Sequence, residues 1–530
     1  MADISLVFVL DAHMPFVRHP DSPGCVEESW FFNALSNTYL PLLRTCTTLE
    51  TEGIPFKLAI AFSPTLCEMM ADPLLQERYI SHLDKSIEFG LAELDRSKGS
   101  VDTRERIRSE LDRIELNRRD FCDIYERNIL PKFDYFAMHG YLEILATTAT
   151  SCFLPLYSDI PEAINAQIET GLLVYRKHFT AIPTGFWLPA MAWCPRLAPI
   201  IKAYGFQYTF VDSHAVLFAD PPSDTGVFSP AICSNGLLVF ARDFFSLTDV
   251  TSTDSSFDQN RVYLDTERDV GFELSESLLS PLFDVHQGRR ITGFRYYAKS
   301  AENQDQGSLY DEGLARTQIE EDARQFIQRR FETLNKASSL LEGAPVSICA
   351  TYPASLFGQS WYEGPAWLEA TFRQLAVHPE LSAALPCQRA IPRQLSQPIE
   401  PYCSSGLQGG YAEDVLNSAN DWMYPYIRKA TLRMIDLAER FPDDNGLKER
   451  ALNMSARELL LAQSMDWFIM MNDREHSDYA KRRFQESVRA FTVVYESLGS
   501  NFISTEWLTK IEKVDNLFPE INYRVYSKKK

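Results

Sequence analysis

Short runs of consecutive apolar residues recur along the chain, and stretches with helical periodicity separate many of them. Such runs are typical of strands that are buried on both faces, as in a parallel sheet. Strands that alternate with helices predict βα units and a parallel barrel of the α/β class. The expected strands are 4–10, 56–62, 183–188, 208–212, 237–240 and 346–351.

Two regions depart from this alternation. Residues 65–130 are charged and helical in period, which indicates a helical subdomain inserted into the barrel. Near the C-terminus, helical patterns cover 414–440, 447–472 and 477–498. The predicted domains are a barrel formed by 1–64 and 131–400, the insertion at 65–130 and a C-terminal helical domain at 401–530.

Composition excludes several classes of partner. The 530 residues carry a formal net charge of −20, and a surface of that sign repels nucleic acid and anionic membranes. The N-terminus has no basic n-region, and its apolar run is too short to span a membrane. Ten cysteines without a Cys-x-x-Cys pair predict a reducing, cytoplasmic location with neither a disulfide framework nor a zinc site.

Several long motifs carry a family resemblance. They include LDAHMPFVRHP at 10–20, GFWLPA at 185–190, YPASLFGQSWYEGP at 352–365 and RELLLAQSMDW at 457–467. Over nearly its whole length the chain resembles glycoside hydrolase family 57, and most closely its 1,4-α-glucan branching enzymes. The resemblance implies an incomplete barrel of seven βα units, a C-terminal helical domain that closes one side of a cleft, and α-glucan as the ligand.

The chain departs from this family at the positions that carry its chemistry. Ala190 stands where the family has its glutamate nucleophile, and Pro353 stands where it has its aspartate acid/base. Retaining glycosidases need two carboxyl groups about 5–5.5 Å apart, and neither alanine nor proline supplies one. Further departures are Asp11, Ser151 and Gln359 for histidine and Ser360 for tryptophan. Several losses on separate segments favour a natural pseudoenzyme, inactive or strongly impaired, over a single engineered knockout.

Four carboxylates remain as candidates for the site: Asp11, Asp212, Glu363 and Asp466. Either Asp11 or Asp212 paired with Asp466 could span the roughly 6.5–9.5 Å that inverting hydrolysis requires. The alternative is that these side chains orient hydroxyl groups or cap helices. Asp11 and His13 lie two apart and so face the same side of a strand end, which suits sugar hydroxyls or a cation. Hydroxyls are the favoured interpretation, and no metal or cofactor is expected.

Tryptophans near the motifs are the candidates for stacking on sugar rings, because flat aromatic rings cover the apolar faces of a sugar. Core packing is the alternative: it is favoured for Trp187, while for Trp361 and Trp467 cleft and core are equally supported. His214 lies in no motif that marks it as catalytic. The predicted substrate-binding set is Asp11, His13, Trp187, Asp212, Trp361, Glu363, Asp466 and Trp467.

Three functional hypotheses remain open. The first is an inactive relative of branching enzymes and α-amylases that binds α-glucan or another carbohydrate, or regulates a protein partner. The second is an active enzyme that uses non-standard carboxylates. The third is a protein-interaction scaffold without sugar binding. Losses at Ala190 and Pro353 argue against the second, and the surviving His13, Glu363 and Asp466 argue mildly against the third.

Overall fold

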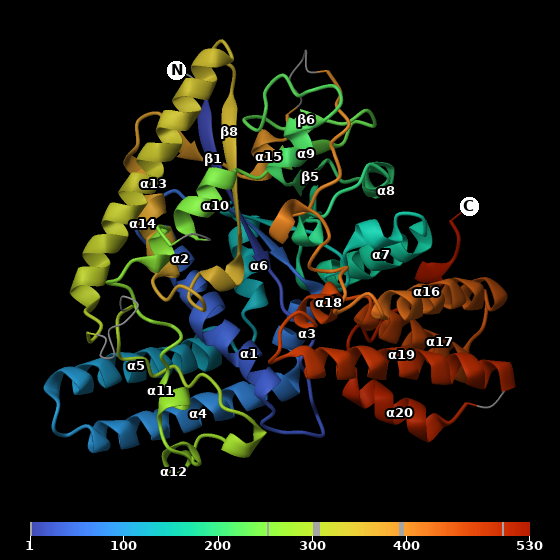
Figure 1. Cartoon of the computed structure of the whole chain (residues 1–530), viewed down its shortest axis with the longest axis horizontal. Coiled ribbons are helices and arrows are strands. Elements are labelled where there is room, and N and C mark those ends of the chain that lie inside the picture. Colours follow the sequence, from blue (N-terminus) through green and yellow to red (C-terminus); the bar gives the residue numbers. More distant parts are fainter. Residues whose placement is uncertain (1–2, 252–253, 300–307, 392–396, 501–502, 530) are drawn as a thin grey trace.

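The computed structural model describes the chain except residues 1–2, 252–253, 300–307, 392–396, 501–502 and 530 (Figure 1). In this part of the chain, parallel strands form a barrel around which helices are arranged, which confirms the predicted α/β class. Its strands, in the order in which they neighbour one another, are β1 (Ile4–Ala12), β2 (Leu58–Phe62), β3 (Leu142–Leu145), β4 (Gly185–Phe186), β5 (Tyr208–Val211), β7 (Leu238–Ala241) and β8 (Val346–Pro353).

The barrel closes through short contacts at two places. A single parallel bridge between Ala146 and Phe186 joins β3 to β4, and another between Arg242 and Cys349 joins β7 to β8. β1 pairs with β8 along residues 4–11 and so completes the ring. Two short strands lie outside it: β6 (Ala231–Ile232) pairs antiparallel with β7, and β9 (Leu381–Ala383) pairs with the start of β1.

The barrel interior is a packed core. Alternate residues of a strand point to opposite faces, so Val7 and Val9 of β1 face inward while Phe8 faces the surrounding helices. The inward side chains of the other strands and of the residues beside them are Ala59, Ala61, Leu145, Trp187, Tyr208, Phe210, Leu238, Phe240 and Cys349. Both faces of β1 are therefore buried, which explains its unbroken apolar run.

Helices cover the outside of the barrel. On one side, Phe8 packs against Phe326 and Phe372, with ring centroids 6.1 and 5.5 Å apart. The helices of this layer are α1 (Val26–Ala34), α2 (Leu40–Thr51), α7 (Pro161–His178), α8 (Leu197–Ala203), α9 (Ser213–Leu217), α10 (Phe244–Val250), α13 (Glu312–Leu340) and α14 (Gly364–Val377). A π-helical segment, η1 (Leu35–Tyr39), joins α1 to α2.

The region predicted as an insertion, 65–130, is helical, and a later part of the chain packs beside it. It contains α3 (Pro64–Ala71), α4 (Pro73–Arg96), α5 (Val101–Arg119) and the π-helical η2 (Asp120–Ile124), and α6 (Leu130–Met138) then leads to β3. The segment with α11 (Val270–Glu273) and α12 (Glu276–Leu279) lies near α4 in Figure 1, and Arg106 Nε donates to Arg295 O at 3.0 Å. The sequence analysis had assigned that segment to the barrel.

The C-terminal helices form a separate layer, orange to red in Figure 1. They are α16 (Met423–Arg440), α17 (Gly446–Ala462), α18 (Met465–Met470), α19 (Ser477–Ser500) and α20 (Thr505–Val514). The helix expected at 414–440 begins only at 423, because the preceding residues form turns in which Asn420 Nδ2 donates to Asp414 O. The helix expected at 447–472 is divided at Ser464, whose backbone is extended. Among the described helices, none has the length and apolarity to cross a membrane.

Candidate functional site

The residues predicted to carry function gather at the C-terminal ends of the barrel strands. Asp11 is in β1 and His13 follows it, Ala190 follows β4, Asp212 follows β5 and Pro353 ends β8. In parallel barrels this edge holds the functional side chains. We call it the barrel mouth.

One cluster at the mouth joins the barrel to the C-terminal helices. His13 Nε2 lies 2.8 and 3.0 Å from the two carboxylate oxygens of Asp466, and Ser464 Oγ donates to the same carboxylate at 2.5 Å. Burial lowers the pKa of His13, but the charge and hydrogen bond of Asp466 outweigh burial, so the pKa is raised overall. Because the helix is interrupted at Ser464, between α17 and α18, the Asp466 carboxylate lies next to His13 of the barrel.

Asp11 is the second acid of this cluster. Burial raises its pKa from 3.8 to about 6, against the lowering effects of His13 and the Trp187 indole. In the sheet register Asp11 is the partner of Pro353. Register partners of a parallel pair point to the same face, about 4.8 Å apart. A titratable carboxyl thus lies one strand away from the position at which the family resemblance places its acid/base.

Ala190 lies in a constrained turn. Its φ of 53° and the φ of 49° at Met191 are both left-handed, which is uncommon for residues other than glycine. Gly406 N donates to Ala190 O at 2.6 Å, and a Cβ on Gly406 would lie 2.6 Å from Met191 Cε. Gly406 therefore permits the close approach of two chain segments next to Ala190. Ala190 is partly exposed and Pro353 is exposed, so the mouth is open to solvent at both positions.

A second polar cluster surrounds Asp212. One of its oxygens lies 3.0 Å from His214 Nδ1 and the other accepts from Arg242, while His214 Nε2 lies 3.0 Å from Gly410 O. Both ring nitrogens of His214 therefore face oxygen acceptors. Asp212 is buried, and both of its carboxylate oxygens contact neighbouring side chains, so it holds His214 and Arg242 in position at the mouth.

Three members of the predicted set lie in the core instead. Trp361 is 0% exposed against Tyr263 and Trp367, and Trp467 is 1% exposed with its Nε1 donating to Leu461 O at 2.7 Å. Glu363 is buried and accepts from Leu264 N at 2.8 Å, and burial raises its pKa to about 7. The cleft alternative for Trp361 and Trp467 is corrected, because neither ring face is available to a ligand.

Trp187 is 3% exposed and belongs to the interior of the barrel, as favoured from the sequence. Its buried Nε1 has no hydrogen-bond partner of ordinary geometry, yet the indole still lowers the pKa of Asp11. Trp187 therefore lies beneath the mouth and influences it through the pKa of the neighbouring Asp11 carboxyl. Neither face of its ring is open to a ligand.

Exposed aromatics that the sequence analysis missed lie at the same edge. Phe244 and Phe245, at the start of α10 directly after β7, are 52% and 65% exposed. Tyr411 is 43% exposed and packs edge-on against His214 at 5.3 Å. The sequence feature that could have identified Phe244 and Phe245 is their position, adjacent to each other and shortly after the strand predicted at 237–240. Exposed rings beside polar side chains suit the apolar faces of a sugar.

One group of residues has metal-ligand chemistry. Among the described residues, ligand atoms of His19, Cys25 and Glu27 lie within 4.8 Å of one another. The surroundings oppose a cation: burial and nearby arginines such as Arg483 lower the pKa of His19 to about 4, and Arg482 lies 3.9 Å from Glu27. Asp11 and His13, for which a cation was considered, form no such group with a third ligand in the described part of the chain.

Comparisons with known proteins agree along the whole chain. The profile described as "Glycosyl hydrolase family 57" matches residues 7–324, and "1,4-alpha-glucan branching enzyme, C-terminal" matches residues 426–526. The crystal structure of the alpha-amylase AmyC from Thermotoga maritima is similar with a TM-score of 0.92 and 32% identity, covering 100% of both chains.

Branching enzymes from two archaea are also similar. A 1,4-alpha-glucan branching enzyme of Thermococcus kodakarensis is 27% identical over 97% of this chain and 77% of its own length. The crystal structure of the GH57-type branching enzyme from Pyrococcus horikoshii has a TM-score of 0.87 and 25% identity, covering 100% of this chain and 97% of that one.

Proposed function

The chain belongs to glycosyl hydrolase family 57, and on that basis we propose that it binds α-glucan at the barrel mouth without performing the retaining reaction. The observation that carries this proposal is the pair of residues at the ends of β4 and β8. Ala190 and Pro353 occupy the nucleophile and acid/base positions of the resemblance, and neither side chain carries a proton or a lone pair for chemistry. The two-carboxyl mechanism therefore lacks both of its groups.

Binding is supported by what the mouth retains. Asp11, His13 and Asp466 are partly exposed polar groups that can orient hydroxyls, and Phe244 and Phe245 offer exposed rings at the same edge. The net charge of −20 does not repel a neutral polymer. The exposure of Pro353 and the partial exposure of Ala190 also favour sugar binding over a scaffold in which these positions are covered.

The test measures binding and turnover on the same preparation. Amylose is supplied to the full-length protein, and affinity electrophoresis is run beside branch-point and reducing-end assays. We expect retardation by amylose without products. Phe245→Ala should weaken retardation about 5-fold or more, since losing a sugar-stacking ring costs roughly 1 kcal/mol. Phe272→Ala, which truncates a 47% exposed ring on α11, is the matched control. Absence of retardation at every amylose concentration would refute the proposal.

A second candidate function rests on Asp11. Its carboxyl lies in register with Pro353, and its pKa of about 6 leaves part of the population protonated near neutral pH, as a general acid requires. Asp466, whose carboxylate lies 2.8 Å from His13 Nε2, would then be the base that activates water in an inverting hydrolysis. Turnover of amylose that disappears in both Asp11→Asn and Asp466→Asn would support this alternative over the inactive protein.

A further inference from the structure

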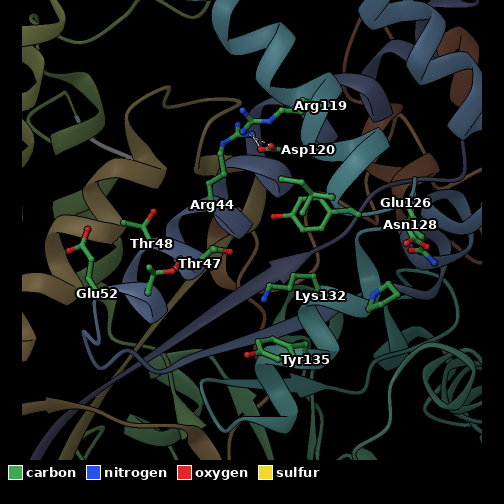
Figure 2. Close-up of a pocket in the computed structure, with 14 residues that line it drawn as sticks. Arg44, Thr47, Thr48, Glu52, Arg119, Asp120, Glu126, Asn128, Lys132 and Tyr135 are labelled. Carbon is green, nitrogen blue, oxygen red and sulfur yellow. Dashed lines mark hydrogen bonds and ion pairs between the residues drawn. The ribbon is translucent and has the colours of Figure 1, made fainter.

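A large cavity lies away from the mouth. Between α2 and the segment η2–α6 there is a cavity of about 1020 Å³, drawn in Figure 2. α2 leads from the C-terminal end of β1 back to the N-terminal end of β2, and Glu52 at the end of α2 also lines the cavity. The cavity therefore flanks the barrel on its outside, away from the mouth. Its volume is at the upper end of the roughly 300–1000 Å³ that ligand pockets occupy.

One wall of this cavity has unusual backbone. α5 passes into the π-helical turn η2 (Asp120–Ile124), and two residues further on Glu126 and Arg127 have φ of 47° and 69°. π-Helical turns and left-handed residues other than glycine cost free energy, and both are concentrated at functional sites. This wall is thus formed where the helix ends, and Arg127 N donates to Phe121 O there at 2.8 Å.

The charges of the lining balance and are mostly paired within the protein. Three basic side chains, Arg44, Arg119 and Lys132, face three acidic ones, Glu52, Asp120 and Glu126. Asp120 lies 2.8 Å from Arg44 and 3.2 Å from Arg119, as Figure 2 shows. Glu52 pairs with Arg373 at 2.6 Å. An anionic ligand would compete with these carboxylates, so the lining favours a neutral one.

The remaining lining combines partly exposed ring edges with oxygen acceptors. Tyr135 is 38% exposed, but Lys132 Nζ lies 3.8 Å from the centre of its ring and the ring of His139 lies 4.1 Å away, so its edge is the part that a ligand can contact. The hydroxyl of Thr51 donates to Thr47 O at 2.7 Å, which leaves its lone pairs to accept from a ligand. Ile124, 58% exposed, adds an apolar contact. Apolar surface beside hydroxyl acceptors is complementary to the C–H faces and O–H groups of a sugar.

We propose that this cavity is a second carbohydrate-binding site, which takes a short neutral oligosaccharide segment on the outside of the barrel. The choice of α-glucan as that sugar rests on the function proposed above. A chain long enough to reach both places would bind more tightly than a short one, because the second contact becomes intramolecular.

The experiment uses the full-length protein with two cavity variants. Tyr135→Ala removes a ring, and Thr51→Arg fills the cavity from an exposed position without disturbing a buried side chain. Tyr426→Ala truncates a 58% exposed tyrosine on α16 as the control. Affinity electrophoresis in amylose and calorimetry with maltoheptaose give the affinities, and circular dichroism verifies the fold. We expect both cavity variants to weaken amylose binding at least 5-fold and the control to leave it unchanged.

The outcomes separate this inference from the proposed function. If both cavity variants bind amylose and maltoheptaose like the wild type, the inference is overturned, and loss in Phe245→Ala would still uphold binding at the mouth. If only the cavity variants lose affinity, the inference holds and the mouth is excluded as the main site. A wild type that binds neither sugar overturns both.

Discussion

At the scale of single residues, the proposed absence of the retaining reaction depends on Ala190 and Pro353, whose side chains carry no carboxyl group. Ala190 keeps a left-handed turn and Pro353 keeps its place in register beside Asp11. In the proposed inactive site this backbone geometry is kept, while Ala190 and Pro353 supply no carboxyl group for the reaction. Restoring one group should accordingly be insufficient, since the two carboxyls act in the same step.

The first prediction concerns Ala190→Glu. Alone it should not raise branching or hydrolysis of amylose above background, because residue 353 supplies no proton to the leaving group. Ala190→Glu combined with Pro353→Asp should give measurable products, detected by branch-point and reducing-end assays. Substantial turnover by the single variant would mean that another carboxyl, Asp11 first, already serves as the acid.

The second prediction uses the pKa of Asp11. Burial raises that pKa from 3.8 to about 6 in the folded protein, so on raising the pH the unfolded chain loses its proton first. The free energy of unfolding therefore falls between about pH 4 and pH 6, by at most about 3 kcal/mol. Asp11→Asn should raise the midpoint of urea unfolding at pH 7.5 and leave it nearly unchanged at pH 4. An equal gain at both pH values would indicate packing instead of ionisation.

Sequence motifs predicted several site residues that the structure places at the mouth. They singled out Asp11, His13 and Asp466, which the fold brings together although 453 positions separate His13 from Asp466. They did not distinguish a ring that lines a cleft from one that fills a core. Both positions were therefore possible for Trp361, which is buried in the core. Relatives can share a motif because its residues pack in the core or because they bind a ligand. Exposure distinguishes the two roles, and it depends on parts of the chain that are distant in the sequence.

At the scale of elements, continuous apolar runs predicted six of the seven ring strands among the described residues. β3 was missed because its four residues include Glu143, whose charge interrupts the apolar pattern. That carboxylate is paired by tertiary contacts with Tyr208 and Cys387 N, which no local pattern reveals. The break at Ser464 was hidden for the same reason, since it depends on a bond from Met465 N to Ser151 O.

The third prediction concerns the connection between β8 and α14. Gly358 has φ +106°, and a Cβ there would lie 1.7 Å from Asn37 O in η1. Gly358→Ala should lower the free energy of unfolding by roughly 2–4 kcal/mol, because backbone strain and a backbone clash add together. Gly343→Ala is the control, with φ +76° and nothing within 4 Å, and should cost only about 1 kcal/mol. Equal losses in urea unfolding would show that η1 moves away freely.

At the scale of the whole molecule, the mouth is complete only when the C-terminal helices are docked on the barrel. Arg18 connects the parts near this junction, lying 2.9 Å from Asp72 and donating to Lys513 O at 2.7 Å. Asn516 Nδ2 donates to the same Asp72 carboxylate at 2.8 Å. The ion pair of His13 with Asp466 then spans the mouth itself, so the stability of the docked layer and the shape of the site are linked.

The fourth prediction is a coupling between His13 and Asp466. Single variants His13→Ala and Asp466→Asn and the double variant form a cycle, with interaction free energy expected at roughly 1–3 kcal/mol. The pKa of His13 is raised in the fold, so the stabilisation is fully present below the unfolded pKa of about 6.5 and is lost as the pH rises through the folded pKa. Urea unfolding should therefore give a larger coupling at pH 6 than at pH 9.

The same cycle measured on amylose affinity should also be non-additive, because each single change leaves the other group unoriented at the mouth. If the effects on stability and on amylose affinity were additive at both pH values, His13 and Asp466 would not be coupled. The site would then be formed by the barrel alone, independently of how the C-terminal helices dock.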